Sequence, residues 1–388
     1  MVPGRGTWVR LGILALLIFV FGQIVYWKFV IGPVGAVSAD EALPAVPVTV
    51  VDGLDHPWAL AFLPNGEMLV TERPGRLRLI RDGRLLEEPV AGLPEIAAGG
   101  QGGLLDVVLH PEFTENRLVY LSYSAPGPGG KGTAVGRGRL HGMVLEDFEV
   151  IWQMERFTGT SHHFGSRLVF DGDDLFITTG DRGDRDRAQD TGDTAGKVLR
   201  VSDEGGVLED NPVLPGQRSG SFVFSYGHRN IQGATSISET DDGGLWIHEH
   251  GPQGGDELNI IEAGGNYGWP VITYGREYGT GLKIGEGTER DDIIAPIHYW
   301  VPSIAPSGMA YYTGDKVPQW RGDLFIGSLK FGLLVRLDLD GRKVLQEERM
   351  LQGLGRIRDV RNGPDGYLYL LTDSDNGALI RLEPRPLQ

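Results

Sequence analysis

Residues 59–71 read ALAFLPNGEMLVT, which is two short apolar runs joined by a turn. Each run has the length of a strand, and the Pro-Asn-Gly sequence between them favours a tight reversal of the chain. A two-stranded unit this apolar is marginal in water, so it needs neighbours that cover it. The stretch therefore predicts a β-hairpin that packs against more sheet structure.

The same hairpin pattern recurs along the chain. Each copy has an apolar strand, a short turn containing Pro, Asp, Asn or Gly, and a second apolar strand. The six copies occupy residues 59–71, 105–124, 167–181, 234–250, 308–330 and 357–373. Repetition of one supersecondary unit is the sequence signature of a repeat architecture.

The distance between copies leaves room for two more strands in each unit. GRLRLIRDG at residues 75–83 and GLLVRLDLDG at residues 332–341 look like such third strands. Four-stranded units repeated around an axis form a β-propeller, so the six copies predict an all-β fold with six blades. After the N-terminal segment, no stretch has a sustained helical apolar period. A β-sandwich is the alternative, but it does not readily explain six hairpins of one design.

Composition indicates a folded, turn-rich and acidic protein. Of the 388 residues, 59 are glycine, which is about twice the usual share. An apolar content of 40% is enough for a sizeable core, and the formal net charge of −16 argues against nucleic-acid binding, which needs a basic surface. The chain has no cysteine, which excludes disulfides, thiolate catalysis and cysteine-ligated zinc.

The N-terminus indicates the compartment. Arg5 and Arg10 precede the apolar residues 11–31, an arrangement that leaves the N-terminus in the cytoplasm. Small residues at 37–39 offer a cleavage site, so this segment is either a signal peptide or an uncleaved anchor in the inner membrane. Both alternatives place the rest of the chain in the periplasm or another extracytoplasmic space.

Three parts of the chain follow from these patterns. Residues 1–32 form the signal peptide or membrane anchor. Residues 33–47, rich in Pro, Ala and Val, are expected to be a linker. Residues 48–388 are expected to form the six-bladed propeller.

The repeat also gives each unusual polar residue a position. In a propeller the first strand of each blade lies nearest the axis, so residues just before it and just after the second strand meet at one end of the central channel. Histidines, amides and cations gather at these positions, as expected of a site built on loops of a rigid scaffold. They include Gln101, His162, His163, Asp181, Arg229, Asn230, Gln232, Lys330, Arg356 and Arg358. The alternative is a ring of polar residues that solvates an empty channel.

Four cations in this set indicate an anionic ligand. Arg356 and Arg358 are two residues apart, so on a strand they point to the same side. A cluster of cations in an acidic protein suits a ligand with several carboxylates or phosphates, which arginine can bind with two parallel hydrogen bonds. The four are Arg229, Lys330, Arg356 and Arg358.

Groups for proton transfer and metal binding occur in the same set. His162 or His163, with an ordinary pKa near ~6.5, could act as a general base whose ring Asp181 orients. The loop EHGPQGGDELN at residues 249–259 offers carbonyl and carboxylate oxygens of the kind that calcium prefers. The acidic loop at residues 181–193 could hold a second calcium, although such loops are more often only solvated. No HExxH, GxSxG or P-loop motif is present, so zinc proteases, serine hydrolases and nucleotide hydrolases find no support.

Seven segments together resemble the pyrroloquinoline-quinone (PQQ)-dependent aldose and glucose/sorbosone dehydrogenases, and most of all the bacterial aldose sugar dehydrogenase branch. The resemblance covers about residues 48–384, and its motifs are specific only in combination. It implies a six-bladed propeller that oxidises the C1 hydroxyl of an aldose to the lactone, with hydride transfer to PQQ and an external electron acceptor. The segments are QGGLLDVVLHPEF (101–113), HHFGSRLVF (162–170), YGHRNIQG (226–233), EHGPQGGDELNII (249–261), GGNYGWP (264–270), GSLK (327–330) and RIRDVRNGPDGYLYLLTD (356–373).

The resemblance also implies roles for individual residues. His163 would take the proton, Asp181 would hold its ring, and Arg229 would stabilise negative charge developing on the quinone oxygen. The backbone carbonyls of Gly251 and Pro252 would ligate a calcium ion that contacts the cofactor. The cofactor itself would be held by Gln101, Arg229, Asn230, Gln232, Lys330, Arg356 and Arg358.

One position departs from the family pattern. The soluble glucose dehydrogenase branch has an acidic residue where this chain has His162. The spacing to Arg167 favours His163 as the base, which makes His162 a supporting or merely polar neighbour. The sequence of the loop at residues 273–292, expected over the channel mouth, does not indicate which sugar is bound.

Two other functions remain open at this point. A calcium-dependent lactonase would also use a six-bladed propeller, but carboxylates and amides would dominate its axial site. A non-catalytic binding module would be favoured if the base or the cations were missing.

Overall fold

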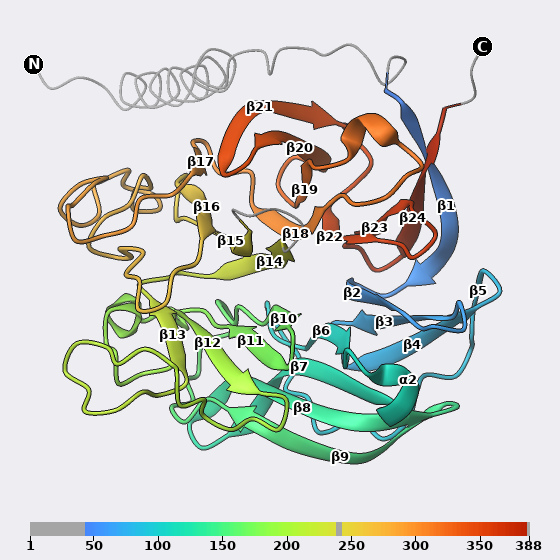
Figure 1. Cartoon of the computed structure of the whole chain (residues 1–388), viewed down its shortest axis with the longest axis horizontal. Helices are drawn as coiled ribbons and strands as arrows, with labels where there is room; N and C mark the ends of the chain where they lie inside the picture. Colours follow the sequence, from blue (N-terminus) through green and yellow to red (C-terminus); the bar gives the residue numbers. More distant parts are fainter. Residues whose placement is uncertain (1–42, 238–242, 386–388) are drawn as a thin grey trace, which may run out of the picture. The chain divides into compact units, whose positions relative to one another are not determined.

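Six separate sheets surround one axis in this protein (Figure 1). The structure is a computed structural model that describes residues 43–237 and 243–385. Within these residues every sheet has four strands, and neighbouring strands in each sheet are antiparallel. The fold is therefore an all-β, six-bladed propeller, which confirms the fold class predicted from the hairpin repeat, and no two-sheet sandwich is formed.

The two inner strands of each blade are the predicted hairpins. The innermost strands contact one another in a ring and are β2 (Pro57–Phe62), β6 (Leu104–Leu109), β10 (Leu168–Asp171), β14 (Ile231–Ile237), β18 (Pro306–Tyr311) and β22 (Ile357–Asn362). The second strands are β3 (Met68–Glu72), β7 (Leu118–Gly127), β11 (Asp174–Thr178), β15 (Gly244–Glu249), β19 (Leu324–Ser328) and β23 (Leu368–Thr372).

Two more strands complete each blade on its outer side. The third strands, which include both segments predicted as such, are β4 (Arg76–Arg81), β8 (Gly130–His141), β12 (Lys197–Ser202), β16 (Asp256–Ile260), β20 (Leu333–Asp340) and β24 (Gly377–Pro384). The outermost strands are β5 (Arg84–Leu85), β9 (Val144–Gln153), β13 (Val223–Tyr226), β17 (His298–Trp300), β21 (Lys343–Met350) and β1 (Ala45–Leu54).

The hairpin turns explain why the first and last repeats share a sequence pattern. In the first hairpin the backbone N–H of Leu63 donates to the carbonyl of Glu67 at 2.8 Å, and Gly66 has a φ of 87°. In the last hairpin Gly366 occupies the same place with a φ of 83°. Glycine is the residue that adopts positive φ without steric cost, so both turns require it.

The ring closes through strands from opposite ends of the chain. β1 pairs with β24 in a register that runs from Ala45 opposite Pro384 to Leu54 opposite Gly377 (blue and red in Figure 1). The N-terminal strand thus completes the blade made by the last three strands. Because β1 begins at Ala45, it includes the end of the segment expected to be a linker, residues 33–47.

Helical structure is minor in the described part of the chain. It consists of α2 (Phe113–Asn116) and the 3₁₀ turns η1 (Arg185–Ala188) and η2 (Pro318–Trp320). No helix in residues 43–237 or 243–385 is long and apolar enough to cross a membrane. The signal peptide or anchor predicted at residues 1–32 lies outside the described residues.

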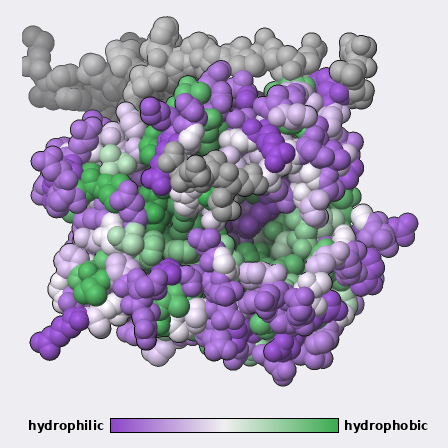
Figure 2. Space-filling view, in the orientation of Figure 1, coloured by the Kyte–Doolittle hydropathy of each residue, from purple (hydrophilic) through white to green (hydrophobic). Residues whose placement is uncertain are grey.

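Apolar side chains between neighbouring blades form the core. Leu69 and Leu79 of one blade and Val107 and Leu121 of the next belong to one cluster and are fully buried. Burial of a side chain of this size stabilises a fold by about 1.5–3 kcal/mol. Figure 2 shows a hollow near the middle of the ring, where hydrophilic residues are visible.

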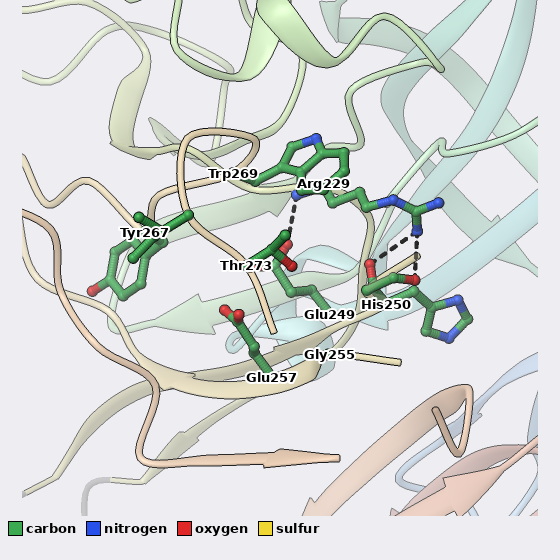
Figure 3. Close-up of a pocket in the computed structure, with 10 residues that line it drawn as sticks. Arg229, Glu249, His250, Gly255, Glu257, Tyr267, Trp269 and Thr273 are labelled. Atoms are coloured by element: carbon green, nitrogen blue, oxygen red, sulfur yellow. Dashed lines mark hydrogen bonds between the residues drawn. The ribbon is translucent and has the colours of Figure 1, made fainter. Parts of the chain in front are cut away.

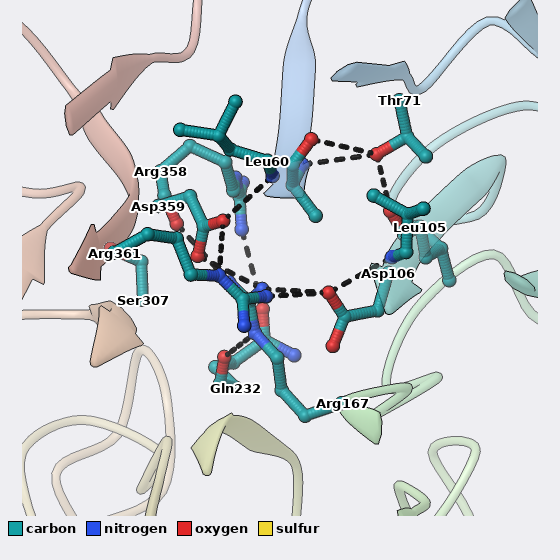
Figure 4. A network of polar contacts seen from close by, with 12 residues as sticks. Leu60, Thr71, Leu105, Asp106, Arg167, Gln232, Ser307, Arg358, Asp359 and Arg361 are labelled. Atoms are coloured by element: carbon teal, nitrogen blue, oxygen red, sulfur yellow. Dashed lines mark hydrogen bonds and ion pairs between the residues drawn. The ribbon is translucent and has the colours of Figure 1, made fainter. Parts of the chain in front are cut away.

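Two arginines and two aspartates lie on the inner strands or directly before one, and form what we call the axial network: Asp106, Arg167, Asp359 and Arg361 (Figure 4). Arg167 Nη1 is 3.0 Å from Asp359 Oδ1 and 3.4 Å from Asp106 Oδ1. Arg361 completes the square, with Nη2 2.6 Å from Asp106 Oδ1 and Nε 2.9 Å from Asp359 Oδ2. The charges balance, two against two.

Backbone N–H groups also donate to both carboxylates of this network. The N–H of Leu168 donates to Asp106 Oδ2 at 2.9 Å, and the N–H of Leu60 donates to Asp359 Oδ2 at 3.0 Å. The side chains of Asp106 and Asp359 are at most 1% exposed. Buried charges of this kind are tolerated only when they are paired and hydrogen-bonded, so the axial network fastens the inner strands across the axis.

Candidate active site

The residues expected to transfer and to orient a proton are in contact. His163 Nδ1 lies 2.6 Å from Asp181 Oδ1. His163 has a φ of 57°, and its backbone N–H donates to Gln101 Oε1 at 2.7 Å, so Gln101 helps to hold the turn that presents the ring. The side chains of His163 and Asp181 are only 12% and 2% exposed. Three residues predicted for the site therefore meet: His163 and Asp181 flank one hairpin, and Gln101 precedes the hairpin before it.

Asp181 is held at both of its oxygens. Oδ1 also accepts from the backbone N–H of Gly183 at 2.8 Å, and Oδ2 accepts from the indole N–H of Trp269 at 2.8 Å. Burial raises the pKa of Asp181, but the donors, above all His163, outweigh burial and bring the pKa below its ordinary value. Asp181 therefore stays ionised. Trp269 was missed from the sequence, where its only signal was its place in the GGNYGWP segment.

The protonation of His163 follows from this arrangement. An ionised carboxylate can only accept, so Nδ1 of His163 carries the hydrogen and Nε2 keeps its lone pair. Burial lowers the pKa of His163 below its ordinary value and Arg229 adds to this effect, while the hydrogen bond to Asp181 opposes it. The ring is thus neutral, and able to accept a proton at Nε2, near neutral pH.

His162 lies beside this pair and takes no part in its hydrogen bond. Its ring contacts that of His163 edge to face, with centroids 4.6 Å apart. Burial lowers the pKa of His162, Asp181 opposes this, and Arg182 and Arg229 add to it. The carbonyl of His162 accepts from the buried guanidinium of Arg182.

Arg229, from the turn before β14, lines a pocket together with Trp269, the residue that donates to Asp181 (Figure 3). Its Nη1 donates to the carbonyls of His250 at 3.0 Å and Gly251 at 2.9 Å, and its guanidinium carbon is 5.4 Å from the centroid of the Trp269 indole ring. Among the described residues, Arg229 forms no ion pair with a carboxylate. Its positive charge is therefore held in place but not neutralised.

Two carboxyl groups lie deeper in the pocket of Figure 3. Glu249 accepts from His228 Nδ1 at 2.8 Å and from the backbone N–H of Arg229 at 2.5 Å. Burial, and next the neighbouring Glu249, raise the pKa of Glu257 well above its ordinary value. The pair thus carries less negative charge than two exposed carboxylates would.

The predicted amides form a chain toward the cations. Asn230 Oδ1 accepts from the backbone N–H of Gly165 at 3.2 Å and from Gln232 Nε2 at 3.3 Å. Gln232 Oε1 in turn accepts from Arg358 Nη1 at 3.3 Å. Asn230 and Gln232 therefore link the turn after His163 to the arginines of the last blade.

Arginines outnumber carboxylates at the last blade. Asp373 Oδ2 is 3.0 Å from Arg358 Nη2 and 3.1 Å from Arg356 Nη2, and Asp373 Oδ1 is 3.8 Å from Arg73 Nη2. Burial raises the pKa of Asp373, but the arginines outweigh it and lower the pKa to about 2. Three guanidinium groups share one carboxylate, and we call these four residues the cation cluster. Arg73 was not predicted.

The guanidinium of Arg358 supports a ligand at the cation cluster. Arg358 is 7% exposed, and its Nε has no hydrogen-bond partner among the described residues. Lys330, which follows β19, is exposed, and its backbone N–H donates to the carbonyl of Ile304 at 3.3 Å. Buried donors without partners are rare in folded proteins, and an anion bound here would supply the acceptor.

The two carbonyls expected to bind calcium already accept hydrogen bonds. Gly251 O accepts from Arg229, and Pro252 O accepts from the hydroxyl of Tyr278 at 2.7 Å. Asp256, in the same loop, accepts from the backbone N–H of Gly251 at 3.0 Å and closes the loop on itself. In the described part of the chain, no group of three or more His, Asp or Glu side chains could hold a metal ion. Each of these carbonyl oxygens has a second lone pair, so calcium binding at Gly251 and Pro252 stays a prediction.

The side chain of Lys197, the first residue of β12, lies against the acidic loop at residues 181–193. Lys197 Nζ donates to the carbonyls of Arg187 at 2.7 Å, Ala188 at 3.1 Å and Ala195 at 2.6 Å. Burial lowers the pKa of Lys197 to about 7. The amino group of Lys197 thus occupies the carbonyl oxygens that a second calcium could have used.

Comparison with known proteins places this site in a family. The profile of the glucose/sorbosone dehydrogenases matches residues 54–381. The chain belongs to this family. Aldose sugar dehydrogenase YliI of Escherichia coli is 46% identical over 364 residues, which cover 90% of this chain and 97% of YliI. Family membership makes the protein an oxidoreductase of the quinoprotein sugar dehydrogenase type.

Solved structures agree with this assignment. The apo-form of the soluble aldose sugar dehydrogenase from Escherichia coli superposes with a TM-score of 0.84 at 45% identity, over 88% of this chain and all of that chain. The PQQ-bound aldose sugar dehydrogenase from Streptomyces coelicolor gives a TM-score of 0.70 at 29% identity, over 88% and 98% of the two chains. The predicted resemblance is therefore confirmed.

Proposed function

We propose that this protein oxidises the C1 hydroxyl of an aldose to the lactone, with PQQ as the hydride acceptor and His163 as the general base. The observation that carries the proposal is the hydrogen-bonded pair of His163 and Asp181 beside unbalanced positive charge. A related aldose sugar dehydrogenase has been solved in its PQQ-bound form, which supports the choice of cofactor.

The proton has a defined acceptor in this proposal. His163 Nε2 takes the proton of the C1 hydroxyl, while Nδ1–H stays on Asp181 Oδ1. The imidazolium that forms is stabilised by the ionised carboxylate 2.6 Å away. A positioned base of this type accelerates proton transfer by about 10²–10⁴-fold.

The cation cluster and Arg229 fit an anionic quinone. PQQ supplies a hydride acceptor when it is bound, and its carboxylates match Arg358, Arg356 and Lys330, with the free Nε of Arg358 as one donor. Gln101, Asn230 and Gln232 would hold its polar edge. Arg229 would stabilise negative charge that develops on the quinone oxygen, because fixed positive charge in a buried site needs no reorganisation.

Calcium stays a prediction, and no step of the proposal depends on it. A cation at Gly251 and Pro252 would share these carbonyl oxygens with Arg229 and Tyr278. The arginine-rich cluster also disfavours the lactonase alternative. The presence of a general base, His163, with Asp181 hydrogen-bonded to it disfavours a pure binding module. An external electron acceptor and an extracytoplasmic location, with anchoring through residues 11–31, complete the proposal.

Spectroscopic titration tests the proposed function. Purified apo-protein is titrated with PQQ, with and without calcium, and an aldose is then added while quinone reduction is followed by absorbance. We expect saturable PQQ binding and reduction that depends on the sugar. Saturable binding without reduction would favour the binding module, and the absence of binding would refute the dehydrogenase proposal.

A further inference from the structure

Trp269 lies in the segment between β16 and β17 and contacts the proton-transfer pair of His163 and Asp181. The family resemblance assigns no role to Trp269. Its indole N–H donates to Asp181 Oδ2 at 2.8 Å, while Asp181 Oδ1 faces His163. The two oxygens of Asp181 are thus divided between the two rings. If Oδ2 had no donor, the carboxylate could rotate and present either oxygen to His163.

The indole is itself held rigidly. The backbone N–H of Trp269 donates to the carbonyl of Gly227 at 2.8 Å, and its carbonyl accepts from Gln189 Nε2 at 2.8 Å. Gln189 also exchanges two hydrogen bonds with the side-chain amide of Asn266, at 2.9 and 3.0 Å. Trp269 is 6% exposed and packs against Ala188. A donor fixed in this way can impose its geometry on its acceptor.

The charged groups around His163 determine what the indole changes. The titratable and charged groups that act on the His163 ring are Asp181, Arg229, His162 and His250. Asp181 is the only anion in this group. Burial lowers the pKa of His250 to about 3, so His250 is neutral. The attraction between Asp181 and a protonated His163 is therefore the electrostatic interaction most directly altered by a donor on Asp181.

We propose that Trp269 is a positioning residue for proton transfer at His163, acting through Asp181; this inference rests on the proposed function. The indole N–H fixes the rotation of the carboxylate. It also shares the negative charge of Asp181, so that Asp181 holds the proton of His163 less tightly. Without the indole donor, the pKa of His163 should rise, and less of the base should be neutral near pH 7.

The test replaces Trp269 by phenylalanine and uses a matched control. Trp246 is 1% exposed, and its Nε1 has no hydrogen-bond partner among the described residues. Trp246→Phe therefore removes the same atoms from a buried site without removing a hydrogen bond. The His163 imidazole is titrated by NMR in apo-protein of the parent, W269F and W246F, and kcat, KM and PQQ affinity are measured on the same samples.

We expect the His163 midpoint to move upward by about 0.5 to 1 pH unit in W269F, the effect of one hydrogen bond. The kcat at pH 7 should fall about tenfold or less, with PQQ affinity unchanged and with W246F equal to the parent. An unmoved midpoint in W269F, or an equal change in W246F, would overturn the proposal. A moved midpoint in a protein that oxidises no sugar would instead refute the proposed function, because the titration needs neither sugar nor cofactor.

A second measurement needs no variant. The indole N–H signal of Trp269 in the parent, assigned through its own backbone signals, should shift with pH at the midpoint of His163, because both rings share Asp181. If the chemical shift of the indole N–H did not change while His163 titrates, the proposal would be overturned even if W269F did not fold.

Discussion

The axial network and the cation cluster are both built from arginine and aspartate, but only in the axial network are the charges balanced. In the axial network two arginines face two aspartates, and one backbone N–H group donates to each carboxylate. In the cation cluster three arginines face Asp373 alone, and Arg358 Nε has no partner among the described residues. Balanced buried charge indicates a structural role, whereas unbalanced charge indicates a place for a ligand.

The largest expected effect is on the axial network, where the charges are balanced. Asp359→Ala leaves Arg167 and Arg361 with one carboxylate between them, and an uncompensated buried charge typically costs about 3–5 kcal/mol. Denaturant unfolding of apo-protein should show a loss of that size. A loss below about 1 kcal/mol would mean that the network does not fasten the inner strands.

The next effect is confined to turnover. His163→Ala removes the proposed base and should lower kcat by about 10²–10⁴-fold, while PQQ affinity and stability change little. His162→Ala is the matched control and should retain most of the activity, because its ring does not bond to Asp181. If His162→Ala were the inactive variant, the base would be assigned to the wrong histidine.

The pH dependence of the parent should reflect the same pair. Burial lowers the pKa of His163, so the base is neutral above that value and is lost as pH falls through it. The value of kcat/KM should therefore decline only below about pH 6.5, the ordinary histidine pKa. Asp181, with its lowered pKa, stays ionised throughout this range. A decline that begins above pH 7 would contradict the account.

The smallest effect is expected at an exposed ion pair near the site. Arg185 Nη1 is 2.7 Å from Glu277 Oε1, with both side chains more than one third exposed. Glu277→Gln should leave the melting temperature of the apo-protein close to that of the parent, as is usual for exposed pairs. A clear decrease would show that exposure is a poor guide to the value of ion pairs in this protein.

The sequence predicted the blades because each hairpin carries its own signal, as the glycines at positions 66 and 366 illustrate. It did not predict that β1 would complete the last blade, since the pairing of Ala45 with Pro384 joins opposite ends of the chain. The repeat did place Gln101, His163 and Asp181 together. The local sequence pattern was sufficient to predict the place of a residue wherever the repeat determined that place.

Contacts made by loops outside the repeat could not be predicted. Trp269 is 88 residues from Asp181 in sequence, and Arg73 reaches Asp373 from the other end of the chain. The hydrogen bonds to the two expected calcium ligands were equally unpredictable, because Tyr278 and Arg229 approach these carbonyls from distant segments. Such contacts depend on three-dimensional packing and have no local signature.

The most direct test of the account is Arg358→Ala, measured for PQQ affinity and for thermal unfolding of the apo-protein. The account predicts that affinity falls about ten- to a hundredfold, since a charge-assisted hydrogen bond contributes roughly 1.5–3 kcal/mol. The melting temperature should stay close to that of the parent, because Arg356 and Arg73 still neutralise Asp373. Unchanged affinity, or a loss of stability as large as that of Asp359→Ala, would contradict the claim that the unbalanced cations hold the cofactor.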